Sequence, residues 1–314
     1  MIIARFLHSS RRVALDIKQQ LLDLNSLHVE SLPFRKIIDV ASQTYKSPVP
    51  TDHSKLPLVM IHGLFGAKQN YAMVGRTIAE KTSRQVIGLD MRNHGGSDHV
   101  LPHDYIHMAI DTEQYLRQLG KPAILAGHLM GAKVAMLVAL KWPELVEKLV
   151  VIDNSPVASA LDSQFTQDLR AMCHVKLDSE LAKVKLKNLR IEVDRVMQDY
   201  EKDPMVRLFL ISNLKPRASS TDTLPIDFRV PVMSFLKYGV LEKMGEWPAT
   251  EVQGLKFEKP VLLLRGFHSP FVPDLKVFDE YFQDIHVVNY DCGHWLVSER
   301  PKKFVADMIE FIED

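Results

Sequence analysis

The sequence is poor in cysteine and has no excess of either charge. Its two cysteines, Cys173 and Cys292, lie far apart and show neither C-x-x-C nor metal-type spacing. No disulfide framework is therefore expected, which fits a reducing environment. The 39 basic and 39 acidic residues cancel, so net charge gives no argument for a nucleic-acid partner. Apolar runs stay below the roughly 18 residues that a transmembrane helix needs, and no transmembrane segment is expected.

The first fifteen residues are basic and contain no acidic residue. Arg5, Arg11 and Arg12 are interspersed with apolar residues and serines, and the first acidic residue is Asp16. An Arg-rich, acid-poor amphipathic start is typical of a mitochondrial presequence, although a basic tail without a targeting role has the same composition. A secretory signal is disfavoured because no uninterrupted apolar segment follows. We expect residues 1–45 to be a presequence-like terminus with a connecting arm, and the protein to be mitochondrial, in the matrix.

From residue 58 onward, short apolar runs alternate with helical patterns. We expect strands over 37–45, 58–61, 85–89, 124–126, 149–152, 261–266 and 286–290, and helices over 71–81, 111–119, 132–141 and 301–312. Strands that alternate with helices in this way form parallel sheets with right-handed crossovers. The sequence therefore predicts an α/β fold with a mainly parallel central sheet flanked by helices.

A central segment interrupts this alternation. Residues 158–258 are charged and helical in pattern, contain several prolines and show no obvious strand. A helical insertion between two strands of a sheet is a usual place for a lid over a pocket. We therefore expect a core formed by residues 46–157 and 259–314, and a helical lid formed by residues 158–258.

The segment around residue 129 has the layout of a nucleophile elbow. A short strand ends in Gly127-His128-Leu129-Met130-Gly131, and a helix follows. In the elbow pattern G-x-S-x-G, the glycines allow strand and helix to approach closely, and the central residue is strained and raised above the sheet. Here the central residue is Leu129 instead of serine. Taken alone, the pentapeptide fits an ordinary strand-to-helix turn equally well.

Five segments together are more specific than the elbow. In chain order they are 62–66 (HGLFG), 90–97 (DMRNHGGS), the elbow, 153–156 (DNSP) and 291–295 (DCGHW). Their order and spacing resemble the α/β-hydrolase superfamily, and more narrowly the branch of the yeast mitochondrial ethanol acetyltransferases and the mammalian abhydrolase-domain-11 proteins. The resemblance covers about residues 55–314. It implies an α/β-hydrolase fold with a helical lid.

The resemblance also implies a catalytic base and an acid that orients it. His294 follows the last strand, where Gly293 allows a close turn, and it is the expected base. In the resembled branch the acid follows the strand after the elbow, and Asp153 occupies that place. The loop after residues 261–265, which carries the acid in many α/β-hydrolases, has no carboxylate before Asp274. Asp274 is therefore the alternative acid.

The same resemblance implies an oxyanion hole made of backbone amides. The expected donors are the N–H groups of Leu64 and Met130. His128 matches a position at which the family's G-H-S-x-G pattern supports the turn. The segment 90–97 is expected to brace a loop rather than to contact substrate, because its polar side chains can satisfy backbone groups.

Leu129 stands where the nucleophile is expected, and leucine cannot form an acyl-enzyme. Loss of a triad nucleophile lowers kcat by about 10⁶. Three explanations are open: a natural pseudoenzyme, a mutation of an active enzyme, or a CUG codon translated as leucine where the host reads serine.

With serine at position 129, the resemblance implies acetyl transfer from acetyl-CoA to ethanol through an acetyl-serine. Thioesterase and acetyl-ester hydrolase reactions would accompany it. Acetyl-CoA is then a substrate, and neither a bound cofactor nor a metal is expected. The alternatives are a non-catalytic module that binds acyl-CoA or a partner protein, and a simple carboxylesterase or thioesterase. The expected partners are small molecules, and the oligomeric state is not predicted.

Overall fold

The computed structural model describes residues 15–23, 29, 31–215 and 226–314. The basic segment with Arg5, Arg11 and Arg12 lies outside these residues. The chain divides into two compact units. The core unit contains residues 34–159 and 244–314, and the helical unit contains the described parts of 1–33 and 160–243. Within the described residues, no helix combines the length and the apolar character needed to span a membrane.

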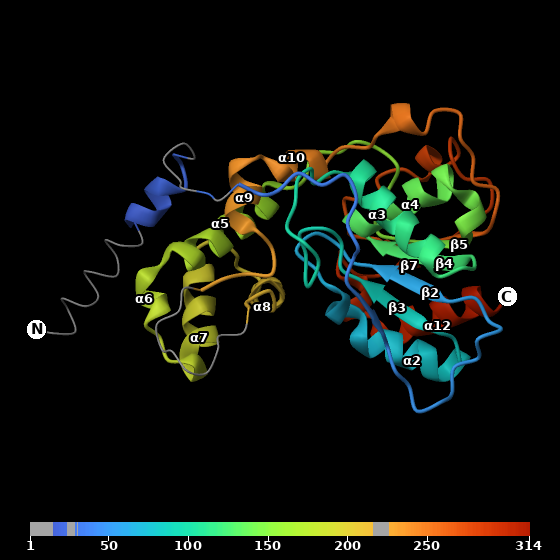
Figure 1. Cartoon of the computed structure of the whole chain (residues 1–314), viewed down its shortest axis with the longest axis horizontal. Coiled ribbons are helices and arrows are strands. Elements are labelled where there is room, and N and C mark those ends of the chain that lie inside the picture. Colours follow the sequence, from blue (N-terminus) through green and yellow to red (C-terminus); the bar gives the residue numbers. More distant parts are fainter. Residues whose placement is uncertain (1–14, 24–28, 30, 216–225) are drawn as a thin grey trace, which may run out of the picture. The chain divides into compact units, whose positions relative to one another are not determined.

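A seven-stranded sheet forms the centre of the core unit (Figure 1). Its strands are β1 Ser42–Thr44, β2 Leu58–Ile61, β3 Val86–Leu89, β4 Ala123–His128, β5 Val146–Ile152, β6 Val261–Gly266 and β7 Ile285–Tyr290. Across the sheet their order is β1-β3-β2-β4-β5-β6-β7. Only β1 runs antiparallel to its neighbour, and the other pairs are parallel. The predicted mainly parallel α/β sheet is confirmed.

The middle strands are buried along their whole length. Every residue of β2, β3 and β4 is buried, as expected for parallel strands that are covered by helices on both faces. The first strand is shorter than the predicted 37–45. Ahead of β1, the N–H of Ile38 donates to Oδ1 of Asp111 at 2.9 Å. This N–H is therefore hydrogen-bonded to a side chain and not to a neighbouring strand.

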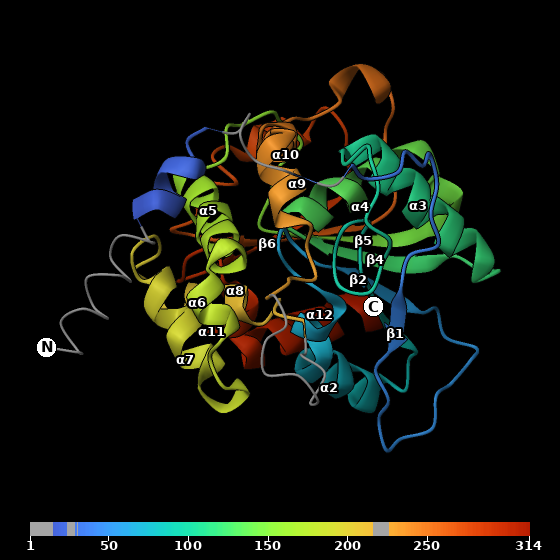
Figure 2. The same ribbon diagram turned by 60° about the vertical axis from the view of Figure 1, so that its left-hand side comes forward.

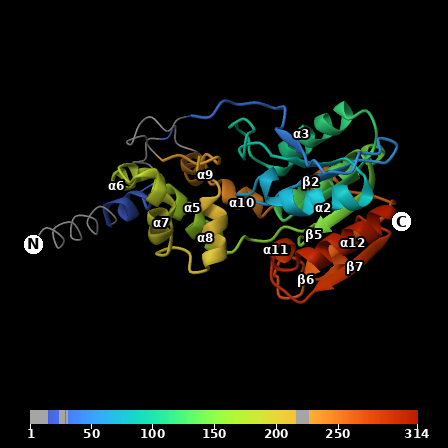
Figure 3. The ribbon, with the colours of Figure 1, turned by 90° about the horizontal axis from the view of Figure 1, so that it is seen from below.

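Helices cover both faces of the sheet (Figures 1 and 3). The helices of the core are η1 Lys68–Tyr71, α2 Ala72–Thr82, α3 Tyr105–Gln118, α4 Met130–Lys141, η2 Pro143–Leu145, η3 Ala249–Glu251, η4 Leu275–Phe278, α11 Leu296–Glu299 and α12 Pro301–Glu313. The prediction that α3 begins at Asp111 was wrong. The helix begins at Tyr105 because Asp104 caps it by accepting the N–H of His107 at 2.9 Å.

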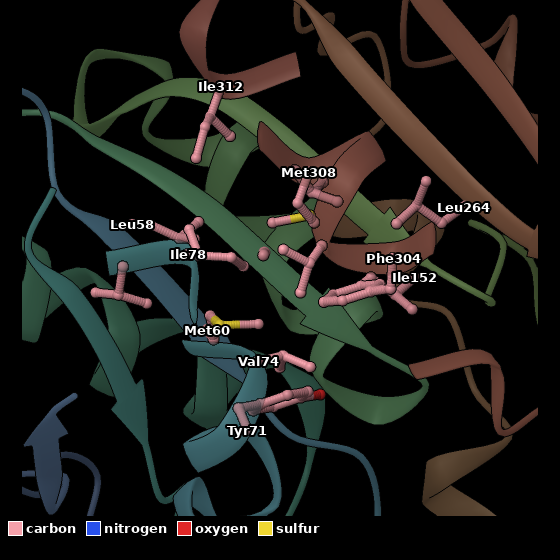
Figure 4. Close-up of a cluster of buried hydrophobic side chains, with 14 of the residues drawn as sticks. Leu58, Met60, Tyr71, Val74, Ile78, Ile152, Leu264, Phe304, Met308 and Ile312 are labelled. Carbon is pink, nitrogen blue, oxygen red and sulfur yellow. The ribbon is translucent and has the colours of Figure 1, made fainter. Parts of the chain in front are cut away.

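Figure 4 shows the apolar layer between the sheet and the pair α2 and α12. Leu58 and Met60 of β2 meet Ile78 of α2 and Phe304 and Met308 of α12 in this layer. Each side chain of this size stabilises the fold by roughly 1.5–3 kcal/mol when fully buried. The layer therefore holds the strands rigidly, so that the loops at their carboxyl ends have a fixed base.

The helical unit is made of short helices with their own buried contacts. They are α5 Ser163–Leu177, α6 Ser179–Ala182, α7 Leu186–Met197, α8 Pro204–Ile211 and α9 Val232–Lys237, and α10 Val240–Met244 leads out of the unit. Helix α7 packs against α5 and against α8, and the three helices are labelled in Figure 2. Met172, Val193, Leu210 and Phe235 are fully buried here. In the described part of 158–258 the structure contains helices and two isolated bridges, one between Leu214 and Phe228 and one from Phe257 to Phe282.

The helical unit ends earlier than the insertion expected over 158–258. Residues 244–258 belong to the core unit. The core itself holds this segment: Tyr105 donates its hydroxyl to the carbonyl of Met244 at 2.8 Å. Nζ of the buried Lys133 donates to the carbonyls of Gly245 and Glu246 at 3.2 and 2.8 Å. Burial lowers the pKa of Lys133 to about 8.

Candidate active site

The turn between β4 and α4 holds Leu129 in a strained backbone conformation. Its φ is 49° and its ψ is −112°, a combination that costs a non-glycine residue on the order of 1–3 kcal/mol. The N–H of Leu129 donates to the carbonyl of Ile152 at 3.1 Å. Nδ2 of Asn154 donates to the carbonyl of Leu129 at 2.8 Å. The end of β5 therefore fixes the turn from both sides of residue 129.

The two glycines of the turn are required by contacts between backbones. A β-carbon at Gly127 would lie 2.0 Å from the carbonyl oxygen of Gly131, and one at Gly131 would lie 2.4 Å from that of Ile61. Neither oxygen can move without displacing a strand or a helix. The explanation predicted from the sequence, close passage of strand and helix, is confirmed.

An acid and a base meet beside this turn. Nδ1 of His294, which follows β7, lies 2.7 Å from Oδ2 of Asp153, which follows β5. The carboxylate of Asp153 has no exposed surface. Its Oδ1 accepts the N–H of Gly266 at 2.9 Å, and its Oδ2 accepts the hydroxyl of Ser269 at 2.5 Å. Protein donors thus engage both oxygens, which holds the carboxylate in one orientation toward His294.

The alternative acid lies elsewhere in the core. Asp274 is exposed, and its carboxylate accepts the N–H of Lys276 at 3.0 Å as the cap of η4. The structure therefore brings Asp153, and not Asp274, to the histidine.

Two aromatic groups flank the His294 ring. The ring of His128 stacks on it with centroids 4.6 Å apart, and the ring of Phe271 lies at 4.5 Å. Nε2 of His128 is also 3.3 Å from the carbonyl oxygen of His294. Burial, and secondarily the neighbouring His294, hold the pKa of His128 well below its ordinary value. His128 is therefore neutral near pH 7 and packs on the base without competing for its proton.

Two backbone amides at the turn have no hydrogen-bond acceptor in the described part of the chain. Among the residues that the structure describes, no group accepts the N–H of Leu64 or of Met130. Met130 is the first residue of α4, where helix amides carry a partial positive charge. A β-carbon at Gly63 would lie 3.2 Å from Cβ of Leu129, so the loop of Leu64 reaches the elbow. Two free donors beside the nucleophile position can stabilise a developing oxyanion.

Two buried histidines hold the loop that carries Leu64. Nε2 of His94 accepts the N–H of Phe65 at 3.2 Å, and Nε2 of His62 accepts the N–H of Met91 at 3.1 Å. Burial lowers the pKa of both imidazoles, so each remains a neutral acceptor near pH 7. The two histidines link the loop after β2 to the loop after β3.

The segment 90–97 satisfies loop backbone groups, as predicted. Asp90 accepts the N–H groups of Lys68 and Gly96 at 2.7 and 2.8 Å. The hydroxyl of Ser97 donates to the carbonyl of Asp90 at 2.6 Å and accepts the N–H of Ala41 at 2.8 Å. The prediction of a structural brace is confirmed.

Ser269 was not predicted from the sequence, and neither was the role of Asn154. Both act through hydrogen bonds between distant parts of the chain. The available signal was weak: Ser269 lies in the loop after β6, the place where many α/β-hydrolases carry their acid, and Asn154 directly follows Asp153.

Comparison with known proteins identifies the class. Residues 57–301 match the family described as alpha/beta hydrolase fold. The chain therefore belongs to the α/β-hydrolase family, as predicted. The solved structure of a marine microorganism esterase is 25% identical, with a TM-score of 0.73, and the match covers 90% of this chain and 100% of that one.

The curated relatives narrow the resemblance. An abhydrolase domain-containing protein of Schizosaccharomyces pombe is 37% identical over 262 residues, which cover 82% of this chain and 92% of the relative. Ethanol acetyltransferase 1 of Wickerhamomyces anomalus is 32% identical over 302 residues, which cover 91% of this chain and 77% of the relative. A probable alcohol acetyltransferase of Saccharomyces cerevisiae is 30% identical over 268 residues, which cover 82% of this chain and 77% of the relative. The predicted resemblance to this branch is confirmed.

Proposed function

We propose that this protein is built as an acyl-transfer enzyme of the ethanol acetyltransferase type, with position 129 as the seat of a serine nucleophile. The observation that carries the proposal is the pair of Asp153 and His294, 2.7 Å apart and beside an intact elbow. The relatives named ethanol acetyltransferase support acetyl as the transferred group and ethanol as the acceptor.

In the proposed reaction the hydroxyl of a serine at 129 attacks the thioester carbonyl of acetyl-CoA. His294 takes the hydroxyl proton through Nε2, while Asp153 holds Nδ1 and stabilises the imidazolium. The N–H groups of Leu64 and Met130 stabilise the oxyanion. The C–S bond then breaks, the imidazolium protonates the CoA thiolate, and an acetyl-serine remains.

In the second half of the reaction ethanol replaces CoA. His294 removes the hydroxyl proton of ethanol, whose oxygen attacks the acetyl carbonyl. Ethyl acetate leaves, and the serine recovers its proton from the imidazolium. Water or a thiol in place of ethanol gives hydrolysis or transfer to the thiol. In the proposal, exclusion of water from the acetyl-serine favours ethanol as the acceptor.

The chain as written has Leu129 at this seat and cannot carry out these steps. We propose that it is inactive in covalent acyl transfer and that Leu129→Ser gives activity. The test compares ethyl acetate formation from acetyl-CoA and ethanol, and acetyl-ester hydrolysis, in the two forms. The expected gain in kcat is up to about 10⁶. A folded but silent Leu129→Ser protein would refute the catalytic proposal.

A second function is favoured by one observation, the side chain of Leu129 itself. It is apolar and 5% exposed, so it occupies the nucleophile seat without any reactive group. A pseudoenzyme with this seat would bind acyl-CoA or an acylated partner without turnover. Calorimetric titration of the written chain with acetyl-CoA tests this: binding without product supports it, and absence of binding opposes it.

The origin of Leu129 can be tested on protein taken from its native cells. The mass of the peptide that spans residues 118–133 distinguishes leucine from serine. Serine in that peptide would mean that the leucine of the written sequence arises from mutation or from codon reading. Leucine would support a natural pseudoenzyme.

We propose a mitochondrial location on the basis of the basic N-terminal segment. A fluorescent fusion of the full chain is expected in mitochondria, and a fusion in which Arg5, Arg11 and Arg12 are replaced by glutamine is expected to remain outside. Equal distribution of the two fusions would contradict the proposal.

A further inference from the structure

One surface of the helical unit combines cations with exposed apolar side chains. Residues 181–191, which cover the start of α7, contain Lys183, Lys185, Lys187 and Arg190 and no acidic residue. All four cations are exposed. Leu186 and Ile191 lie among them with 55% and 60% of their surface exposed. We call Lys185, Leu186, Lys187, Arg190 and Ile191 the α7 surface.

Helical spacing makes these residues neighbours. Leu186 and Arg190 are four residues apart, as are Lys187 and Ile191, and Lys187 and Arg190 are three apart. Side chains at these separations lie next to one another on a helix. The α7 surface is therefore one continuous patch of cations and aliphatic groups, along the helix labelled in Figure 1.

The acidic residues at the two ends of this stretch are already paired. Glu180 accepts from Lys183 at 2.7 Å, and Glu192 accepts from Arg195 at 2.6 Å. Among the described residues, none of the ion pairs includes Lys185, Lys187 or Arg190. The patch thus carries three positive charges without local compensation.

This distribution is unfavourable for α7 itself. Cations at a helix N-terminus oppose the helix dipole, whereas acidic residues there are stabilising. Among the described residues, four other α-helices begin with an aspartate cap, and these caps are Asp104, Asp162, Asp178 and Asp203. Helix α7 begins instead after Lys185, without a side-chain cap. Folding of the helix therefore does not account for these charges.

We propose that the α7 surface docks the protein onto an anionic phospholipid membrane. A helix surface with cations and exposed aliphatic residues binds such membranes through attraction to the headgroups and burial of the apolar groups at the interface. Leu186 and Ile191 favour a lipid surface over a small phosphate ligand, because a phosphate gains nothing from exposed aliphatic side chains. This inference does not depend on the proposed reaction.

The test uses the full chain as written and vesicles of phosphatidylcholine, with and without phosphatidylglycerol. Co-sedimentation is expected only with the anionic vesicles and is expected to weaken as salt rises. Each cation near an anionic surface strengthens binding about fivefold. The combined variant Lys185→Glu, Lys187→Glu, Arg190→Glu loses three cations and adds three repelled anions, so it should bind at least about 100-fold more weakly. Glutamate near this helix start is favourable, so the variant is expected to fold, and circular dichroism checks it.

A matched control variant changes the net charge by the same amount, but on the core unit. Arg76, Lys81 and Lys302 are exposed on α2 and α12, and their replacement by glutamate should leave binding near that of the unchanged chain. The pair Leu186→Ser, Ile191→Ser should weaken binding on the order of tenfold. The matched apolar control is Val49→Ser, Met73→Ser, both at exposed positions. Replacement of Arg5, Arg11 and Arg12 by glutamine measures any contribution from the N-terminal segment.

Three results would overturn the proposal. The first is absence of binding between the unchanged chain and anionic vesicles. The second is binding of the α7 charge variant as strong as that of the core control. The third is complete loss of binding in the N-terminal variant alone. Binding of a polyaspartate peptide at the α7 surface, without vesicle binding, would identify a protein-docking surface and would equally refute the lipid assignment.

Discussion

Ser269 donates its hydroxyl to Oδ2 of Asp153, the same carboxylate oxygen that faces Nδ1 of His294. Ser269 lies after β6, and Asp153 lies after β5. Two neighbouring strands of the sheet thus supply one residue each to the same hydrogen-bonded group. The loop that could have carried the acid here supplies a neutral donor to it.

The position of Ser269 suggests that it orients the acid. In the Leu129→Ser background, Ser269→Ala removes a hydrogen bond to a charged group, worth roughly 1.5–3 kcal/mol. We expect kcat to fall by on the order of tenfold or more, because the carboxylate loses one of the contacts that aim it at His294. Ser269→Thr keeps the hydroxyl and is the control. Equal rates for the alanine and threonine variants would mean that this donor is not needed.

The choice between the two candidate acids is tested in the same background. Asp153→Asn is expected to lower kcat by on the order of 10⁴, since the amide cannot stabilise the imidazolium. Asp274→Asn should have little effect, because Asp274 caps η4 and is exposed. Steady-state measurement of kcat for both variants decides which aspartate is the acid. A large loss for Asp274→Asn with a small one for Asp153→Asn would reverse the assignment.

The sequence predicted the fold from local signals, and the resemblance to the α/β-hydrolases predicted the acid-base pair. The glycines of the elbow, the buried apolar strands and His294 after the last strand are each visible within a few residues. Parallel strands then bring their carboxyl ends to one edge, which places Asp153 and His294 together although 141 positions separate them.

The sequence did not predict contacts that depend on side-chain orientation across the fold. Ser269 and Asp153 are 116 residues apart, and nothing near Ser269 indicates its partner. The start of α3 was missed because Asp104 acts as a cap only when the following backbone turns back toward it. Lys133 was missed because a lysine inside an apolar helix pattern gives no sign that it is buried against the carbonyls of Gly245 and Glu246.

The contact between Gly127 and Gly131 predicts a large loss of stability on substitution. In Gly127→Ala the new β-carbon would lie 2.0 Å from a backbone oxygen. Overpacking usually costs roughly 1–3 kcal/mol, and a contact this short with a backbone oxygen is expected to cost at least the upper end of that range. Gly254→Ala is a matched control, since its φ is +74° but nothing lies within 4 Å of the added carbon; it should cost about 1–2 kcal/mol from backbone strain alone. Urea unfolding compares them, and equal losses would show that the clash relaxes.

Buried histidines make the stability of the core dependent on pH. Burial, with Arg92 as the second cause, lowers the pKa of His103 to about 3, whereas an unfolded histidine has a pKa of about 6.5. Between these values the unfolded chain binds a proton that the folded chain does not bind at His103, so stability falls as the pH falls. Asp104 and the neighbouring His62 and His94 are the other titratable groups around this ring.

His103→Gln removes this proton linkage and tests it directly. We compare the free energy of unfolding of the unchanged chain with that of the variant. The difference, unchanged chain minus variant, is expected to decrease by about 1.4 kcal/mol for each unit by which the pH is lowered from about 6.5 to 3. Above pH 7 the difference should be constant, because both states of His103 are then neutral. Urea unfolding at successive pH values measures it, with the exposed His53→Gln as the control. Parallel pH profiles for the unchanged chain and His103→Gln would show that His103 gains its proton in the folded core as readily as in the unfolded chain.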